Sequence, residues 1–137
     1  MNVYVDSSVV VRLVLGQPGE LAEWPSIEVA ISSELTRVEC MRTIDRTAKR
    51  AQLDVETVAE RRSAALELLS RFIMIPISTA IVDRAADPFP TTLGTLDAIH
   101  LASAIEARRE FGPLSMATHD AELALAAVSM GFEVVGV

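Results

Sequence analysis

The sequence contains almost none of several residues that mark particular classes of protein. It has one cysteine and one lysine, and aromatic residues make up only 4% of the chain. The single Cys40 cannot form an internal disulfide, which fits a reducing compartment. No apolar run approaches the roughly 20 residues that a bilayer-spanning helix needs. The amino-terminal stretch lacks a basic region and carries Asp6 ahead of its apolar residues, so it does not resemble a signal peptide. We therefore expect a cytoplasmic protein with no membrane segment.

The composition indicates a folded domain with an uneven distribution of charge. Half of the 137 residues are apolar, and this length suits a single domain spanning residues 1–137. The net charge of −7 taken alone argues against non-specific binding to phosphate backbones. The basic residues are nevertheless concentrated in residues 37–71: Arg37, Arg42, Arg46, Lys49, Arg50, Arg61, Arg62 and Arg71. Because acidic residues share this segment, it forms either a positive face or a pair of ordinary solvated helix faces.

Short β-type runs alternate with helical patterns along the chain. Strands are expected at residues 3–5, 27–31, 72–77, 114–118 and 132–135. Helices are expected at residues 9–15, 33–52, 54–72, 78–86, 95–109 and 121–130, with Ser7 or Ser8 capping the first and Thr95 the fifth. This alternation predicts an α/β fold, a three-layer α/β/α sandwich with a central, mainly parallel sheet of about four to five strands.

Four acidic residues occupy positions that such a topology brings to one rim of the sheet. Asp6 and Asp120 follow the first and fourth strands, and Glu39 and Asp97 lie early in two helices. Ligands of open α/β sheets bind outside the carboxyl ends of the strands. Gathered carboxylates repel one another unless a divalent cation lies among them, and Mg²⁺ prefers oxygen ligands. The pattern indicates either a metal site or four separate structural roles, in which the aspartates stabilise helix starts and Glu39 pairs with Arg42.

The stretches that contain these acids resemble the PIN domain family. They read VYVDSS from residue 3, SSELTRVE from residue 32, LDAIHLA from residue 96 and THD from residue 118. The resemblance extends in order over nearly the full chain, and within the family it is closest to VapC-type toxins of bacterial toxin–antitoxin pairs. It implies the PIN-like sandwich fold and an endoribonuclease that cleaves RNA with Mg²⁺ or Mn²⁺.

The resemblance also implies roles for individual residues. The catalytic and metal-binding acids would be Asp6, Glu39, Asp97 and Asp120. Ser7 and Thr118 would orient these carboxylates through hydrogen bonds. Arg42 and Arg46 are candidate RNA contacts. Glu34 competes with Glu39 for a place in the site, and the resemblance favours Glu39.

Partners and alternatives follow from the same comparison of motifs. The resemblance implies a small antitoxin protein as partner and RNA as substrate, and a homodimer is expected. The chain has no module for direct DNA binding. The alternative function is a catalytically silent PIN-like module that binds a protein or RNA. His100 lies three residues after Asp97, and we expect it to be packed and hydrogen-bonded rather than a metal ligand. A phosphoacceptor domain is disfavoured, because Ser8 stands where a phosphatase would need a second acid.

Overall fold

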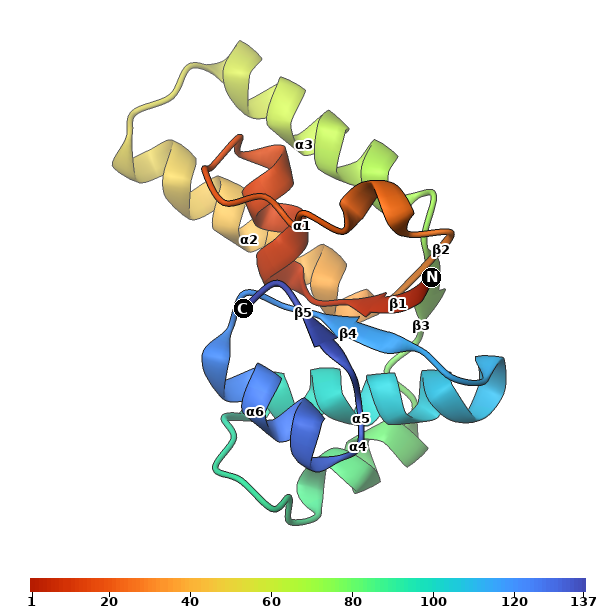
Figure 1. Cartoon of the computed structure of the whole chain (residues 1–137). Helices are drawn as coiled ribbons and strands as arrows, with labels where there is room; N and C mark the ends of the chain where they lie inside the picture. The colour runs from red at the N-terminus through yellow and green to blue at the C-terminus, as the bar shows by residue number, and fades with distance from the viewer.

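A computed structural model describes residues 1–137, and its centre is a parallel β-sheet (Figure 1). The strands are β1 (Asn2–Val5), β2 (Val29–Ser33), β3 (Ile73–Ile75), β4 (Ser115–Ala117) and β5 (Val134–Val135). Their order across the sheet is β3-β2-β1-β4-β5, and every neighbouring pair is parallel. The expectation of a mainly parallel sheet of four to five strands is confirmed, with β1 in the middle.

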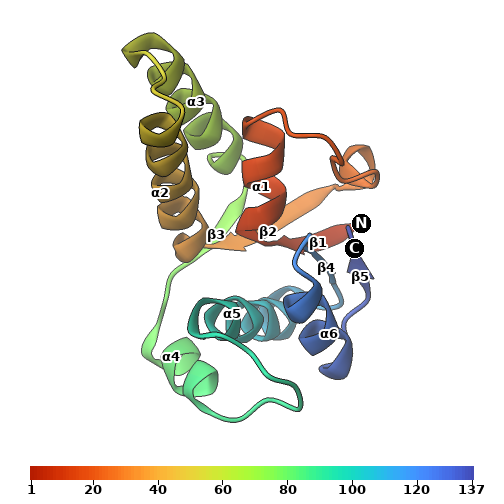
Figure 2. The ribbon, with the colours of Figure 1, turned by 90° about the vertical axis from the view of Figure 1, so that its left-hand side faces the viewer.

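Helices cover both faces of the sheet, as Figure 2 shows. One face carries α1 (Ser7–Val14), α2 (Glu34–Arg50) and α3 (Val55–Leu69). The other face carries α4 (Thr79–Ala86), α5 (Thr95–Phe111) and α6 (Ala121–Ser129). A short 3₁₀ helix, Trp24–Ser26, lies between α1 and β2. No helix is long and apolar enough to cross a membrane. The three layers are those that the alternating pattern predicts.

The central strand β1 contributes to both apolar cores because its side chains alternate between the two faces. Val3 and Val5 belong to the cluster under α1 and α3, whereas Tyr4 belongs to the cluster under α4, α5 and α6. All three side chains are completely buried. The burial of β1 on both faces fixes the position of the residue that follows it, Asp6, at the carboxyl end of the sheet.

Several helix starts differ from the expectation. Asp6, and not Ser7 or Ser8, caps α1, because its extended backbone lets the carboxylate accept from the Ser8 amide. Gly94 occupies the N-cap position of α5 without a side-chain bond, so the expected cap at Thr95 was wrong. Ser33 and Ser78, the first residues of two expected helical ranges, cap α2 and α4. The ends also shift: β3 stops at Ile75, ahead of a proline that cannot donate a ladder hydrogen bond.

Candidate metal centre

Asp6 is the most firmly held acid at the carboxyl rim of the sheet. It leaves β1 at the start of α1, and only 4% of its surface is exposed. Its Oδ2 accepts from the hydroxyls of Ser8 at 2.6 Å and Thr118 at 2.9 Å. Its Oδ1 has only a longer contact with the Ser7 hydroxyl, at 3.3 Å, and one with His100 Nε2, at 3.4 Å. One oxygen is therefore held by the protein, and the other is left more loosely engaged.

Glu39 and His100 meet Asp6 from opposite faces of the sheet. Glu39 lies in the second turn of α2, and His100 lies in α5. His100 Nε2 is 2.5 Å from Glu39 Oε1, and one ligand atom from each of Asp6, Glu39 and His100 lies within 4.8 Å of the others. Glu34, the competing acid, instead pairs with Arg37 at 2.6 Å. The structure brings Glu39, and not Glu34, next to Asp6 and His100.

Asp97 lies in the first turn of α5, half-buried beside these groups. Burial raises the pKa of its carboxyl to about 6, and the negative charges of Asp120 and Asp6 add to the rise. Asp97 is not the N-cap of its helix, since that position belongs to Gly94. The shifted pKa indicates that acids from three separate parts of the chain share one negative region.

Asp120 follows the turn after β4 and caps α6. Its Oδ1 accepts from the amide of Leu123 at 2.9 Å. Capping therefore accounts for one oxygen of Asp120, and capping also accounts for part of the role of Asp6. It does not account for Asp97 or Glu39. The first-turn position of Asp97 still fits a structural role at its helix start. The structural alternative therefore leaves only Glu39 unexplained, because Arg42 pairs with Asp45.

The pKa values of two neighbours of the acids, His100 and Cys40, are raised. Burial lowers the pKa of His100, but the hydrogen bond that His100 donates to Glu39 and the charges of Asp6 and Glu39 outweigh it, so the pKa is raised. Burial, together with the charge of Glu39, raises the pKa of Cys40 to about 12, which leaves an unreactive thiol. His100 is packed and hydrogen-bonded, as expected.

Two groups at this rim were missed by the sequence reasoning, and two predicted contacts lie outside it. Ser8 holds Asp6, and its spacing of two residues from an acid at a helix start was the available signal. Tyr4 hydrogen-bonds His100, and nothing in the sequence pointed to this contact across 96 residues.

Arg42 is an exposed residue of α2 that pairs with Asp45 at 3.2 Å. Arg46 is also exposed on α2, and it donates to the hydroxyl of a neighbouring threonine.

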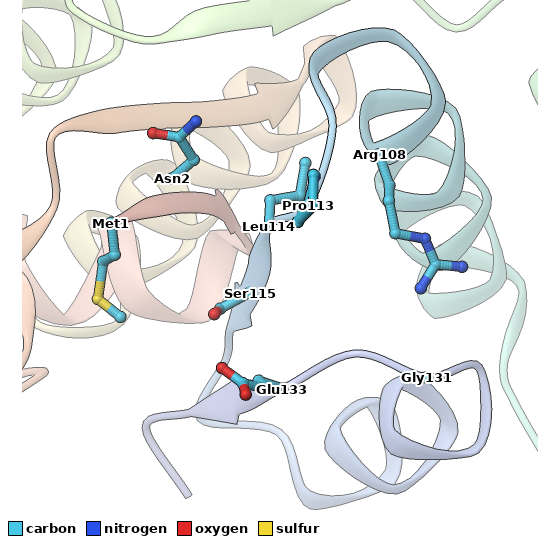
Figure 3. Close-up of a pocket in the computed structure, with 8 residues that line it drawn as sticks. All are labelled: Met1, Asn2, Arg108, Pro113, Leu114, Ser115, Gly131 and Glu133. Atoms are coloured by element: carbon cyan, nitrogen blue, oxygen red, sulfur yellow. The ribbon is translucent and has the colours of Figure 1, made fainter.

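A hollow of about 410 Å³ lies at the other end of the sheet (Figure 3). Its lining includes Asn2 and Ser115, the first residues of β1 and β4. Arg108 also lines it, but its guanidinium stacks over the ring of Phe132 and donates to the carbonyl of Met130. This hollow opens away from the four acids, so the candidate metal centre does not include it.

Comparison with known proteins identifies the family. The profile that describes the PIN domain matches residues 3–128. The chain belongs to the PIN domain family. This PIN domain is 31% identical to ribonuclease VapC47 of Mycobacterium tuberculosis over 137 aligned positions, which cover 95% of this chain and 93% of the relative.

Solved structures share the fold of this PIN domain. A toxin–antitoxin complex from Klebsiella pneumoniae superposes with a TM-score of 0.65 at 22% identity, covering 98% of this chain and 96% of that one. VapBC2 from Rickettsia felis, bound to a DNA fragment from its promoter, gives a TM-score of 0.68 at 14% identity, covering 98% and 99%. At these identities the likeness concerns the fold.

Proposed function

We propose that this PIN domain is a metal-dependent endoribonuclease and the toxin of a type II toxin–antitoxin pair. The observation that carries the proposal is the convergence of Asp6 and Glu39, from β1 and α2, with the shifted carboxyl of Asp97 from α5. The identity of 31% with a ribonuclease over 95% of the chain supports the same activity.

The proposed cofactor is Mg²⁺ or Mn²⁺. The residues that would hold it are Asp6, Glu39, Asp97 and Asp120. Their oxygen donors suit a hard cation. Burial raises the pKa of Asp97 and the charges of Asp120 and Asp6 add to the rise, and a cation would offset these charges. When bound, a divalent cation supplies a water of lowered pKa and offsets charge that develops on a phosphodiester.

The chain's own residues supply the orientation. Ser8 and Thr118 fix Asp6, and Ser7 adds a weaker contact. Glu39, held through Oε1, would orient the attacking water and accept its proton. Arg42 and Arg46 lie three and seven residues after Glu39 in α2, so they follow the same side of the helix and would contact RNA phosphates away from the scissile bond.

The proposed partner is a small antitoxin protein that covers the acids until the toxin is released. The fold shared with toxin–antitoxin structures is consistent with this assignment. We further propose that the protein acts in the cytoplasm, as a homodimer, and that any DNA contact is made by the antitoxin.

Replacing Asp6 tests the activity directly. Asp6→Asn keeps a side chain that can cap α1, so the fold should persist while the anionic ligand is lost. We expect wild-type protein to cleave RNA with Mg²⁺ or Mn²⁺, EDTA to stop cleavage, and Asp6→Asn to reduce the rate by at least about 100-fold.

The control is Asp87→Asn, which removes an exposed aspartate from the loop before α5 and should cleave like wild type. Cleavage by Asp6→Asn at the wild-type rate would refute the catalytic assignment. Wild-type protein that neither cleaves RNA nor binds Mn²⁺ in calorimetry would favour the silent binding module instead.

A further inference from the structure

The imidazole of His100 connects the core to the acidic rim. Its ring is completely buried, although it belongs to the helix that carries the half-buried Asp97. Nδ1 is 2.9 Å from the hydroxyl of Tyr4 in the central strand, and Nε2 is 2.5 Å from Oε1 of Glu39. The two rings meet edge to face, with centroids 6.1 Å apart. Both ring nitrogens thus have partners on other elements of the fold.

The hydrogen-bond partners decide which nitrogen of His100 carries the proton. If Nε2 were bare, its lone pair would face an oxygen lone pair of Glu39 at 2.5 Å. Nε2–H therefore donates to Glu39. The hydroxyl of Tyr4 donates to Nδ1 when the ring is neutral and accepts from it when the ring is charged.

Asp6 and Glu39 are held in parallel ways. Asp6 has one oxygen fixed by the hydroxyls of Ser8 and Thr118. Glu39 has Oε1 fixed by His100, and its side chain, which has three rotatable torsions, is 22% exposed. In each acid the second oxygen is left for a ligand. A metal ligand whose partner fixes its direction binds more tightly than one that must be ordered on binding.

We propose that His100 is a positioning residue, which holds Glu39 at the metal centre while Tyr4 sets the orientation of its ring. The inference rests on the proposed function, because it concerns the same site. It assigns His100 no contact with the cation and none with RNA. His100 acts through Glu39, and Tyr4 acts through His100.

Two amide substitutions provide a matched test. In His100→Gln the amide nitrogen reaches the position of Nε2 and can still donate to Glu39. In His100→Asn the amide reaches only the position of Nδ1, so the bond to Glu39 is lost while polarity is kept. Calorimetry with Mn²⁺ alone should find the affinity of the Asn variant reduced by about 10–100-fold, as for other partners of metal ligands. The Gln variant should retain most of the wild-type affinity.

A spectroscopic measurement tests the hydrogen bond without any metal. Long-range ¹H–¹⁵N correlation spectra of the metal-free protein should show His100 with a proton on Nε2. Tyr4→Phe removes only the hydroxyl, so it should shift the Nδ1 signal of His100 and leave circular dichroism unchanged. A His100 ring without a proton on Nε2 would overturn the inference whether or not the protein is a nuclease.

The remaining outcomes separate the two proposals. If wild-type protein binds Mn²⁺ and cleaves RNA, but both amide variants bind Mn²⁺ as tightly as wild type, the positioning role is wrong and the nuclease stands. Equal losses in the two variants would also overturn it, since the role requires rescue by Gln. Wild-type protein that binds no Mn²⁺ and cleaves no RNA would overturn both the nuclease and the role of His100 within it.

Discussion

The ionisation of Asp97 opposes folding when no cation is present. Its folded-state pKa of about 6 lies above the ordinary value of 3.8, chiefly because burial disfavours the charged form. Between these two values the folded protein binds more protons at this group than the unfolded chain does. The contribution of Asp97 to the free energy of unfolding therefore falls as the pH rises from about 4 to about 6. A salt-bridged carboxylate shows the reverse behaviour.

Asp97→Asn should remove this pH dependence. In the presence of EDTA, the melting temperature of the variant relative to wild type should increase between pH 4 and pH 7, because the amide side chain at position 97 of the variant does not ionise. Thermal unfolding followed by circular dichroism measures the difference. Asp87→Asn, in an exposed loop, should give a difference that does not change with pH. If the melting temperatures of Asp97→Asn and wild type changed in the same way with pH, the assignment of a raised pKa to Asp97 would be contradicted.

At the scale of residues, the sequence revealed the acids but not what holds them. Asp6, Asp97 and Asp120 were recognisable because each follows a strand or begins a helix, where a parallel sheet gathers its ligands. Tyr4 offered no such signal, because its role depends on a contact between β1 and α5 that chain position does not encode. The direction in which Glu39 points was likewise settled only by the packing of α2.

At the scale of elements, the turn after β4 depends on a close approach between two backbone segments, at Gly136 and Thr118. Gly136 follows β5 with φ of 103°, and a Cβ there would lie 2.6 Å from the carbonyl oxygen of Thr118. The carbonyl of Gly136 also accepts from Nδ1 of His119 at 2.7 Å. The carboxyl-terminal residues therefore hold in place the turn that supplies Thr118 to Asp6.

Gly136→Ala should destabilise the protein and weaken the metal centre together. A positive φ at a residue with a side chain costs about 1–3 kcal/mol, and the contact with Thr118 adds to that cost. Gly112→Ala is the matched control, since it has a φ of 84° and no atom near the added Cβ. Urea unfolding should find Gly136→Ala the less stable of the two, and only this variant should lose Mn²⁺ affinity. Equal effects on stability and on Mn²⁺ binding would show that the contact is unimportant.

The starts of α2 and α4 were predictable from the sequence, whereas the buried face of α2 was less so. Ser33 and Ser78 indicate the starts of α2 and α4, because a short hydroxyl side chain accepts a hydrogen bond from a free amide of the first turn. On α2, Val38 is apolar, but its side chain is 56% exposed. The buried residues of α2 are the large apolar Leu35 and Ile44 together with the smaller Thr36, Cys40 and Ala48.

At the scale of the whole molecule, the proposed function requires an acidic protein to bind RNA, which is an acidic polymer. The net charge of −7 repels RNA at long range, so attraction must come from local groups. Arg42 and Arg46 are exposed on α2, which begins at the same rim as the acids, so the basic segment from residue 37 onward leads away from the site. The distribution of charge, rather than its sum, determines where a strand could lie.

The double variant Arg42→Ala and Arg46→Ala should weaken RNA binding without lowering the rate of the bound complex. Binding is measured by fluorescence anisotropy on the Asp6→Asn background, so that the RNA stays intact, and kcat is measured on the active protein. The slope of log affinity against log salt should fall by about 0.7 for each lost phosphate contact. Arg109→Ala, which removes another exposed arginine with an i,i+3 acidic partner at the far end of α5, serves as control. An unchanged salt slope in the double variant would exclude these contacts.

The bond between Thr118 and Asp6 joins positions 112 residues apart in the chain. Thr118 is therefore translated long after Asp6. Under the proposed activity, a growing polypeptide is harmless to the messenger RNA being read and to its neighbours until residue 118 has been added. A premature stop codon anywhere upstream of position 118 therefore yields an inactive fragment, which makes truncation an easy evolutionary route to escape from toxicity.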